Sequence, residues 1–169
     1  MEHRVDYSKA APGVLHSMLN TEKYLAQSGL DSKLRDLVHL RASQINGCAY
    51  CIDMHWKDLR AEGENEQRLY GLDAWAESPY YTDRERAALA WTEAVTRLEG
   101  GHVPDAVFDD VRRFFSDRDL ADLTLCIVAI NGWNRLNIAF RAPAGTYVPP
   151  SKPRGEGAAR PRAPQAASH

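Results

Sequence analysis

The sequence has no long hydrophobic run, no excess of either charge and few cysteines. No segment approaches the roughly 20 consecutive apolar residues that a membrane-spanning helix requires. The polar start Met1–Asp6 also lacks the apolar stretch of a secretory signal. The 21 basic and 23 acidic residues leave a net charge of −2, which offers no electrostatic footprint for nucleic acid or an anionic membrane. We therefore expect a cytoplasmic globular protein that binds neither nucleic acid nor membrane.

Signals for β-strands are scarce, whereas signals for helices are frequent. Alternating apolar and polar residues hardly occur, but apolar residues recur at helical spacing, as at Leu34, Leu37 and Val38. Thr82 forms a capping-box pattern with Glu85, and a similar pattern precedes the longest apolar helix. The sequence therefore predicts an all-α fold of six to seven helices, over residues 12–27, 32–45, 48–62, a short stretch after 65, 83–98, a stretch from 104, and 120–140.

The composition changes after Arg141. Residues 142–169 are rich in Pro, Ala and Gly and have almost no apolar side chains beyond Val148. Such a segment cannot bury enough apolar surface to offset the entropy of folding. We therefore expect a helical domain over residues 1–141 and a disordered, mildly basic tail over residues 142–169. A partner-binding arm is the alternative interpretation of this tail.

The three cysteines are too few, and odd in number, for a disulfide scaffold. Cys126 lies in the apolar run 123–128, where a buried small hydrophobic residue is expected. Cys48 and Cys51 form a C-x-x-C pair. In a reducing compartment such a pair is typical of a redox or metal site rather than of a structural disulfide.

The C-x-x-C pair is expected to share one helical face with His55, because positions three and four apart lie on the same side of a helix. Cα atoms three residues apart on a helix are separated by about 5 Å, which a disulfide tolerates. Cys48 falls in the first turn, where the helix dipole favours a thiolate by about 0.3–1 kcal/mol. His55 can contribute more, as a base or as an imidazolium partner. The pattern predicts a redox centre of Cys48, Cys51 and His55.

Two residues on the preceding predicted helix are candidates to join this centre. Asp36 could orient His55 or accept its proton if the two helices fold back on each other; alone, it would be an exposed surface residue. For His39 we expect a surface or interface position. Zinc is the main alternative to redox chemistry, with Cys48, Cys51, His55 and either His39 or Asp36 as ligands. No second C-x-x-C or H-x-H pair supports it, and an inert buried thiol pair is the remaining alternative.

Several stretches resemble the alkylhydroperoxidase D-like (AhpD-like) core of the carboxymuconolactone decarboxylase superfamily: Leu37–Arg41, Ser43–His55, Glu85–Glu93 and Ile130–Arg135. The resemblance covers roughly residues 10–141. It implies an all-helical homo-oligomer, commonly a trimer or a higher assembly. It also implies a disulfide-cycling peroxidase without haem or metal, so we expect no cofactor.

The resemblance also implies roles for individual residues. In such enzymes the second cysteine, here Cys51, is oxidised by peroxide, and the first, here Cys48, resolves the sulfenic acid into a disulfide. The histidine four residues on, here His55, and an acidic residue twelve before the first cysteine form a proton relay. Asp36 stands where the family has glutamate, one methylene longer, and Tyr50 stands where some members have histidine.

The leading prediction is a thiol-dependent peroxidase that reduces hydroperoxides, with an external dithiol as reductant. One alternative is a carboxymuconolactone decarboxylase-like lyase that uses His55 as acid and base, although that branch generally lacks the C-x-x-C. The other is a non-catalytic redox-sensing protein. Three residues of the last helix could line a pocket over the cysteines, although core and interface packing is the expectation: Asn131, Trp133 and Asn134.

Overall fold

The computed structural model describes residues 2–150, which fold into eight α-helices and two short 3-10 helices. The α-helices are α1 (Tyr7–Ala10), α2 (Pro12–Leu25), α3 (Ser32–Asn46), α4 (Ala49–Ala61), α5 (Glu66–Tyr70), α6 (Asp83–Arg97), α7 (Asp105–Val111) and α8 (Asp117–Phe140), and the 3-10 helices are η1 (Leu72–Ala74) and η2 (Glu99–Gly101). No β-strand occurs in the described residues, so the predicted all-α fold class is confirmed.

Several helix starts differ from the sequence prediction: α4 begins at Ala49 and α8 at Asp117, rather than at residues 48 and 120. The structure adds the single-turn helix α1, whose first turn is capped by Asp6, since the carboxylate accepts a hydrogen bond from the Ser8 N–H at 3.1 Å. The helix predicted from residue 104 begins one residue later, because Pro104 is its N-cap and has extended backbone angles. The Thr82 capping box is present as predicted, with both reciprocal hydrogen bonds to Glu85.

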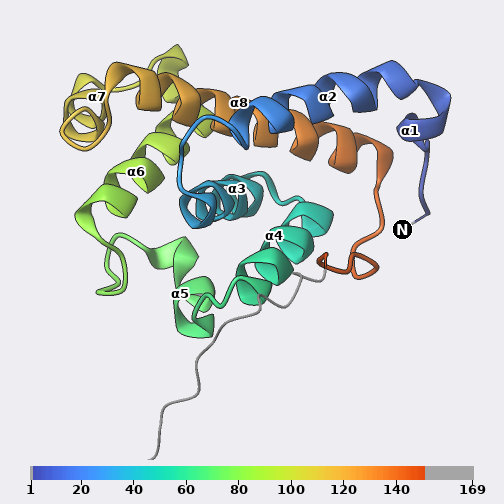
Figure 1. The fold of residues 1–169 in the computed structure, drawn as a ribbon, viewed down its shortest axis with the longest axis horizontal. Coiled ribbons are helices and arrows are strands. Elements are labelled where there is room, and N and C mark those ends of the chain that lie inside the picture. The colour runs from blue at the N-terminus through green and yellow to red at the C-terminus, as the bar shows by residue number, and fades with distance from the viewer. Residues whose placement is uncertain (1, 151–169) are drawn as a thin grey trace, which may run out of the picture.

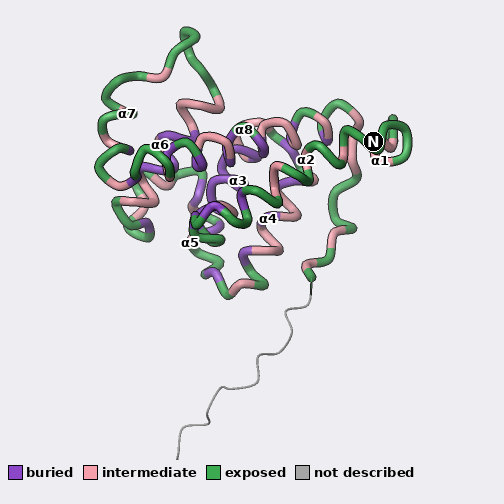
Figure 2. The backbone as a smooth tube through the Cα atoms, turned by 45° about the horizontal axis from the view of Figure 1, so that its top comes forward, coloured by how far each residue is buried: buried purple, intermediate pink, exposed green. Residues whose placement is uncertain are grey.

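Helix α3 occupies the centre of the molecule and packs against α4, α6 and α8 (Figure 1). Helix α2 lies along α8, so the N-terminal and C-terminal helices of the domain are neighbours. The main hydrophobic core fills the space between α3, α6 and α8, with Val38, Ala88, Leu123 and Ile127 fully buried. Buried residues concentrate on these central helices, whereas α1 and α7 are largely exposed (Figure 2). The polar site described below therefore lies where α4 packs against two of these buried helices, α3 and α8.

Gly47 makes the turn that places the C-x-x-C pair at the start of α4. It ends α3 in the left-handed region with φ +70°, a conformation that costs a residue with a Cβ roughly 1–2 kcal/mol. The Cys48 N–H then bonds back to the Ser43 carbonyl oxygen at 3.0 Å, which completes a tight helix end. The chain reverses within two residues, and α4 folds back against α3.

Residues 142–150 lie along α4. The Lys57 ammonium donates to the Tyr147 carbonyl oxygen at 3.0 Å, and the Tyr147 hydroxyl donates to Asp58 at 2.8 Å. The rest of the predicted tail, residues 151–169, lies outside the described residues. None of the described helices is long and apolar enough to cross a membrane.

Candidate active site

The C-x-x-C pair forms a disulfide at the N-terminus of α4. Cys48 is the N-cap residue and Cys51 lies in the first turn, with their Cα atoms 5.4 Å apart. The Cys51 N–H points at the Cys48 sulfur at 3.4 Å, so this sulfur occupies the place of an N-cap acceptor. Both residues are only 1% exposed. The spacing predicted from helical geometry is thus present, and the disulfide joins the N-cap residue of α4 to its first turn.

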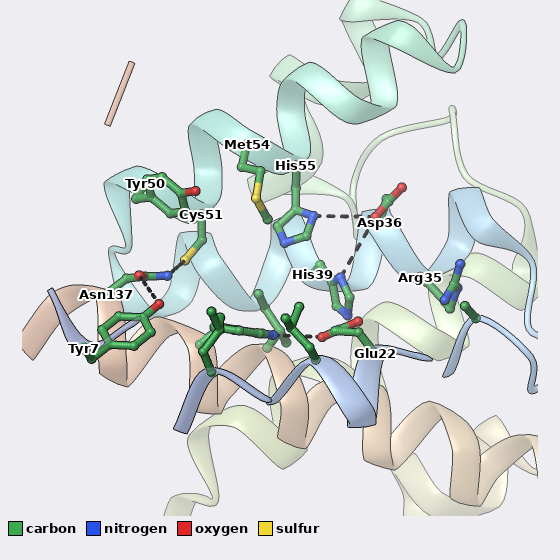
Figure 3. Close-up of a pocket in the computed structure, with 15 residues that line it drawn as sticks. Tyr7, Glu22, Arg35, Asp36, His39, Tyr50, Cys51, Met54, His55 and Asn137 are labelled. Atoms are coloured by element: carbon green, nitrogen blue, oxygen red, sulfur yellow. Dashed lines mark hydrogen bonds and ion pairs between the residues drawn. The ribbon is translucent and has the colours of Figure 1, made fainter. Parts of the chain in front are cut away.

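A cavity of about 460 Å³ opens beside Cys51 and is lined from α1, α2, α3, α4 and α8 (Figure 3). His55 lies on the same side of α4 as Cys51, one turn further on, and both side chains line this cavity. Asp36 and His39 enter it from α3. Its walls are mostly apolar with a few convergent polar groups, which is typical of small-molecule sites.

The Asp36 carboxylate lies between two histidines. Its Oδ1 is 3.5 Å from His55 Nδ1 and 4.0 Å from His39 Nδ1, and the two imidazole rings are 4.7 Å apart (Figure 3). Both Nδ1 atoms are buried, and neither has a hydrogen-bond partner within residues 2–150 at normal distance. The predicted meeting of Asp36 with His55 across the two helices is therefore present in the structure, at a distance slightly longer than a direct hydrogen bond.

His39 lies inside the protein, whereas the sequence suggested the surface or an interface. Its Nε2 is 3.1 Å from the Cys126 sulfur on α8, and the histidine is 5% exposed. Burial raises the pKa of the Cys126 thiol, so this thiol stays protonated and its S–H donates a hydrogen bond to Nε2. Burial lowers the pKa of His39 well below its usual value, with the nearby charges of His55 and Arg35 adding to the effect. His39 is therefore neutral, with its proton on the Nδ1 that faces Asp36.

Asn137 is a site residue that sequence reasoning missed. Its side-chain N–H donates to the Cys51 sulfur at 3.4 Å, and its oxygen accepts from the Tyr7 hydroxyl at 3.2 Å. Asn137 is 6% exposed and also lines the cavity. The signal available in the sequence was its position on an apolar helix, one turn after Trp133, where a polar residue needs a partner. Tyr7 had no such signal, because it reaches the site from α1.

The three predicted residues of α8 have different positions. Trp133 lines the cavity and donates its indole N–H to Glu22 of α2 at 2.9 Å. Asn131 and Asn134 do not line it; both accept hydrogen bonds from the Asn46 side chain, at 2.9 and 2.8 Å. These two asparagines hold the end of α3 against α8, which agrees with the expected packing role.

The structure narrows the metal interpretation to three residues. The predicted four-ligand zinc set needs both thiolates, and these sulfurs are joined to each other in the disulfide. Asp36, His39 and His55 each offer one ligand atom, all within 4.8 Å of one another. The same three side chains also form the histidine–carboxylate arrangement described above, which requires no ion.

Comparison with known proteins identifies related sequences and folds. Residues 12–94 match the model of the carboxymuconolactone decarboxylase family. The chain is 44% identical over 140 residues to the uncharacterised protein YdfG of Bacillus subtilis, covering 83% of this chain and 95% of that one.

Solved structures agree with these sequence matches. A protein of unknown function from Agrobacterium tumefaciens, described as a candidate antioxidant defence protein AhpD, superimposes with a TM-score of 0.83 and 41% identity, over 86% of this chain and 100% of that one. The debrominase Bmp8 has the same fold, with a TM-score of 0.71 and 21% identity, over 82% of this chain and 74% of its own.

Proposed function

Because the chain belongs to the carboxymuconolactone decarboxylase family and has its AhpD-like core, we propose that it is a thiol-dependent peroxidase. It reduces hydroperoxides through a cycle in which Cys48 and Cys51 alternate between two thiols and a disulfide. One observation supports this proposal above the others. The disulfide lies at a helix N-terminus, and its Cys51 end shares a mostly apolar cavity with His55 and Asp36.

The oxidation half-reaction begins at Cys51. Its thiolate attacks the nearer peroxide oxygen, the O–O bond breaks, and the departing alkoxide takes a proton and leaves as alcohol. Cys51 becomes a sulfenic acid, and the Cys48 thiolate attacks its sulfur. The S–S bond forms and hydroxide leaves as water once protonated. In sum, one hydroperoxide and two thiols yield one alcohol, one water and the disulfide.

Three groups around Cys51 support its assignment as the oxidised cysteine. Cys51 lines the cavity of about 460 Å³, whereas Cys48 does not. The Asn137 amide donates to the Cys51 sulfur, which stabilises a thiolate there. His55 can accept the thiol proton and return it to the leaving oxygen, and Asp36 at 3.5 Å stabilises the imidazolium between these steps.

Stopped-flow oxidation of the reduced protein by hydrogen peroxide and by an organic hydroperoxide tests the proposal, with mass spectrometry of the product. The expected product has lost two thiols and contains the Cys48–Cys51 disulfide. Cys51→Ser should not react, and Cys48→Ser should stop at the sulfenic acid without turnover. Full turnover by either variant would overturn the cycle. A protein that keeps both thiols would favour the lyase, and disulfide formation without turnover under any reductant would favour the redox sensor.

The relay is tested by a matched pair of carboxylate variants. Asp36→Asn keeps the shape of the side chain and removes the charge beside His55, so oxidation by peroxide should slow by about 10²-fold. Asp109→Asn makes the same chemical change at an exposed position on α7 and should leave the rate unchanged. Equal rates for Asp36→Asn and the wild type would remove Asp36 from the mechanism.

A further inference from the structure

The two cysteines of the disulfide line different cavities. Cys51 lines the cavity that contains His55 and Asp36, whereas Cys48 lines a second cleft of about 510 Å³. This cleft lies between the α3–α4 turn at Gly47 and the C-terminal end of α8. Tyr50 and Asn137 line both, so these two residues form the wall between them. The disulfide is therefore approached from two directions, one for each sulfur.

The second cleft is lined by positive charge that no carboxylate of its lining balances. Arg4 and Arg141 line it and no carboxylate does, whereas the first cavity has the carboxylates of Glu22 and Asp36 beside Arg35. Two hydrogen bonds hold Arg4 beside the end of α8. Its backbone N–H donates to the Phe140 carbonyl oxygen at 2.9 Å, and its guanidinium donates to the Ala139 carbonyl oxygen at 3.2 Å. Neither arginine makes an ion pair within residues 2–150. An anionic molecule is therefore favoured in this cleft.

We propose that the cleft at Cys48 is the reductant site, and that it takes a low-molecular-weight thiol bearing a carboxylate. This inference rests on the disulfide cycle of the proposed function. The reductant thiolate attacks the Cys48 sulfur from the side opposite Cys51. A new S–S bond forms between reductant and Cys48, and the old bond breaks with its electron pair going to Cys51. A second reductant thiolate then attacks the mixed disulfide, which releases oxidised reductant and the Cys48 thiolate.

The shape of the cleft favours a small molecule over a protein surface. Cys48 is 1% exposed, so a flat partner surface cannot bring its own sulfur into line with the disulfide. A volume of about 510 Å³ falls in the range of small-ligand pockets. A compact thiol can enter such a space and place its carboxylate against the arginines at the same time.

Attack at Cys48 also prepares the protein for the next turnover. The leaving thiolate is Cys51, which accepts the Asn137 hydrogen bond and faces the cavity of His55. Reductant and peroxide then occupy separate spaces, so the two substrates do not compete for one site. The structure thus assigns each sulfur one partner: peroxide for Cys51 and carboxylate thiol for Cys48.

The test measures reduction of the full-length protein after oxidation by diamide, so it does not depend on peroxide reactivity. Trp133 packs against the cluster that contains both cysteines, and its fluorescence reports reduction in a stopped-flow instrument. The probes are 3-mercaptopropionate, which is anionic, and cysteamine, which is cationic. The ratio of their rate constants, compared between variants, cancels the intrinsic reactivity of each thiol. The variants are Arg141→Glu, Arg4→Glu and both together.

The control is Arg118→Glu, because Arg118 is exposed at the other end of α8, about 33 Å from Phe140 along the helix axis. In the double variant the anionic-to-cationic ratio should fall about tenfold, and 1 M salt should remove most of the difference. Arg118→Glu should leave the ratio unchanged. An unchanged ratio in the double variant, or an equal fall in the control, would overturn the proposal.

Two further measurements identify the attacked sulfur and the occupant. The remaining thiol of the C-x-x-C pair is titrated with the anionic disulfide 5,5′-dithiobis(2-nitrobenzoate) in Cys51→Ser and in Cys48→Ser; the third thiol, Cys126, is fully buried and is the same in both variants. Arg141→Glu should slow labelling of Cys48 and spare Cys51; the reverse pattern would overturn the assignment. A change of elution volume on size exclusion in Arg141→Glu would show that a second copy of the chain covers the cleft, which also overturns it. If peroxide failed to oxidise the protein, the peroxidase proposal would be wrong. The reduction and labelling experiments would still test the reductant site, because they do not use peroxide.

Discussion

Replacing Asn137 by leucine should make Cys51 a poorer nucleophile at neutral pH. Leucine has nearly the same shape as asparagine but cannot donate the hydrogen bond that reaches the Cys51 sulfur at 3.4 Å. A donor to a charged acceptor contributes about 1.5–3 kcal/mol, and a sulfur acceptor at this distance belongs at the lower end. Leucine also places an apolar group where the amide donor stood, beside the Cys51 sulfur.

A loss of about 1.4 kcal/mol corresponds to about tenfold in the equilibrium between thiol and thiolate. The thiolate fraction at pH 7 should therefore fall about tenfold in Asn137→Leu. The pH at which the Cys51 reaction rate is half-maximal should rise by about one unit. Well above both midpoints the two proteins should react at the same rate, because both are then fully ionised.

Alkylation by iodoacetamide in a Cys48→Ser background measures this midpoint directly and does not depend on peroxide chemistry. Tyr7→Phe is the matched control: it keeps the Asn137 donor and removes only the hydroxyl that fixes the orientation of its amide, at 3.2 Å. Its midpoint should move less than that of Asn137→Leu. A midpoint in Asn137→Leu equal to that of the Cys48→Ser protein would refute the stabilising role of the amide.

Three other predictions concern stability. Burial lowers the folded-state pKa of His39. Between that pKa and the unfolded pKa of about 6.5, the unfolded chain binds one more proton than the folded chain. The free energy of unfolding in urea should therefore fall by up to about 1.4 kcal/mol for each pH unit below pH 6.5. His39→Gln should flatten this slope, and the exposed His16→Gln should not. Cys126→Ala removes the hydrogen-bond partner of His39 Nε2 at 3.1 Å, so the free energy of unfolding by denaturant should fall by about 1–3 kcal/mol. Cys126→Ser should lower it less, because serine keeps a donor. Thr82→Ala removes the capping box of α6 and should lower the free energy of unfolding by about 1 kcal/mol. The reactivity of the thiols should not change, and a drop in reactivity would link this cap to the site.

Local signals in the sequence were enough to predict every α-helix of the described residues except α1. Apolar spacing and the capping box at Thr82 each act within a few residues, so they need no knowledge of distant contacts. The resemblance to the AhpD-like core, confirmed by the family and structural matches, rested on equally local stretches. The short helix α1 was missed because one turn capped by Asp6 has no apolar periodicity to detect.

The C-x-x-C spacing with His55 was also readable from the sequence, because all three residues belong to one helix. Helical geometry alone sets the separation of the Cys48 and Cys51 Cα atoms and turns His55 to the side of Cys51. The hypothesis that Asp36 approaches His55 needed one further condition, that α3 and α4 fold back together. Gly47 provides that condition through its left-handed backbone.

Only the tertiary structure decided what surrounds each sulfur. Asn137 of α8 contacts Cys51, Tyr7 of α1 contacts Asn137, and Cys126 meets His39 across 87 residues. No local pattern encodes such contacts, because they depend on how α8 and α1 pack over α3 and α4. The division into two cavities, one at each cysteine, has the same origin. The sequence by itself thus determined the reactive pair and its helix, and packing determined which side of the pair each partner can reach.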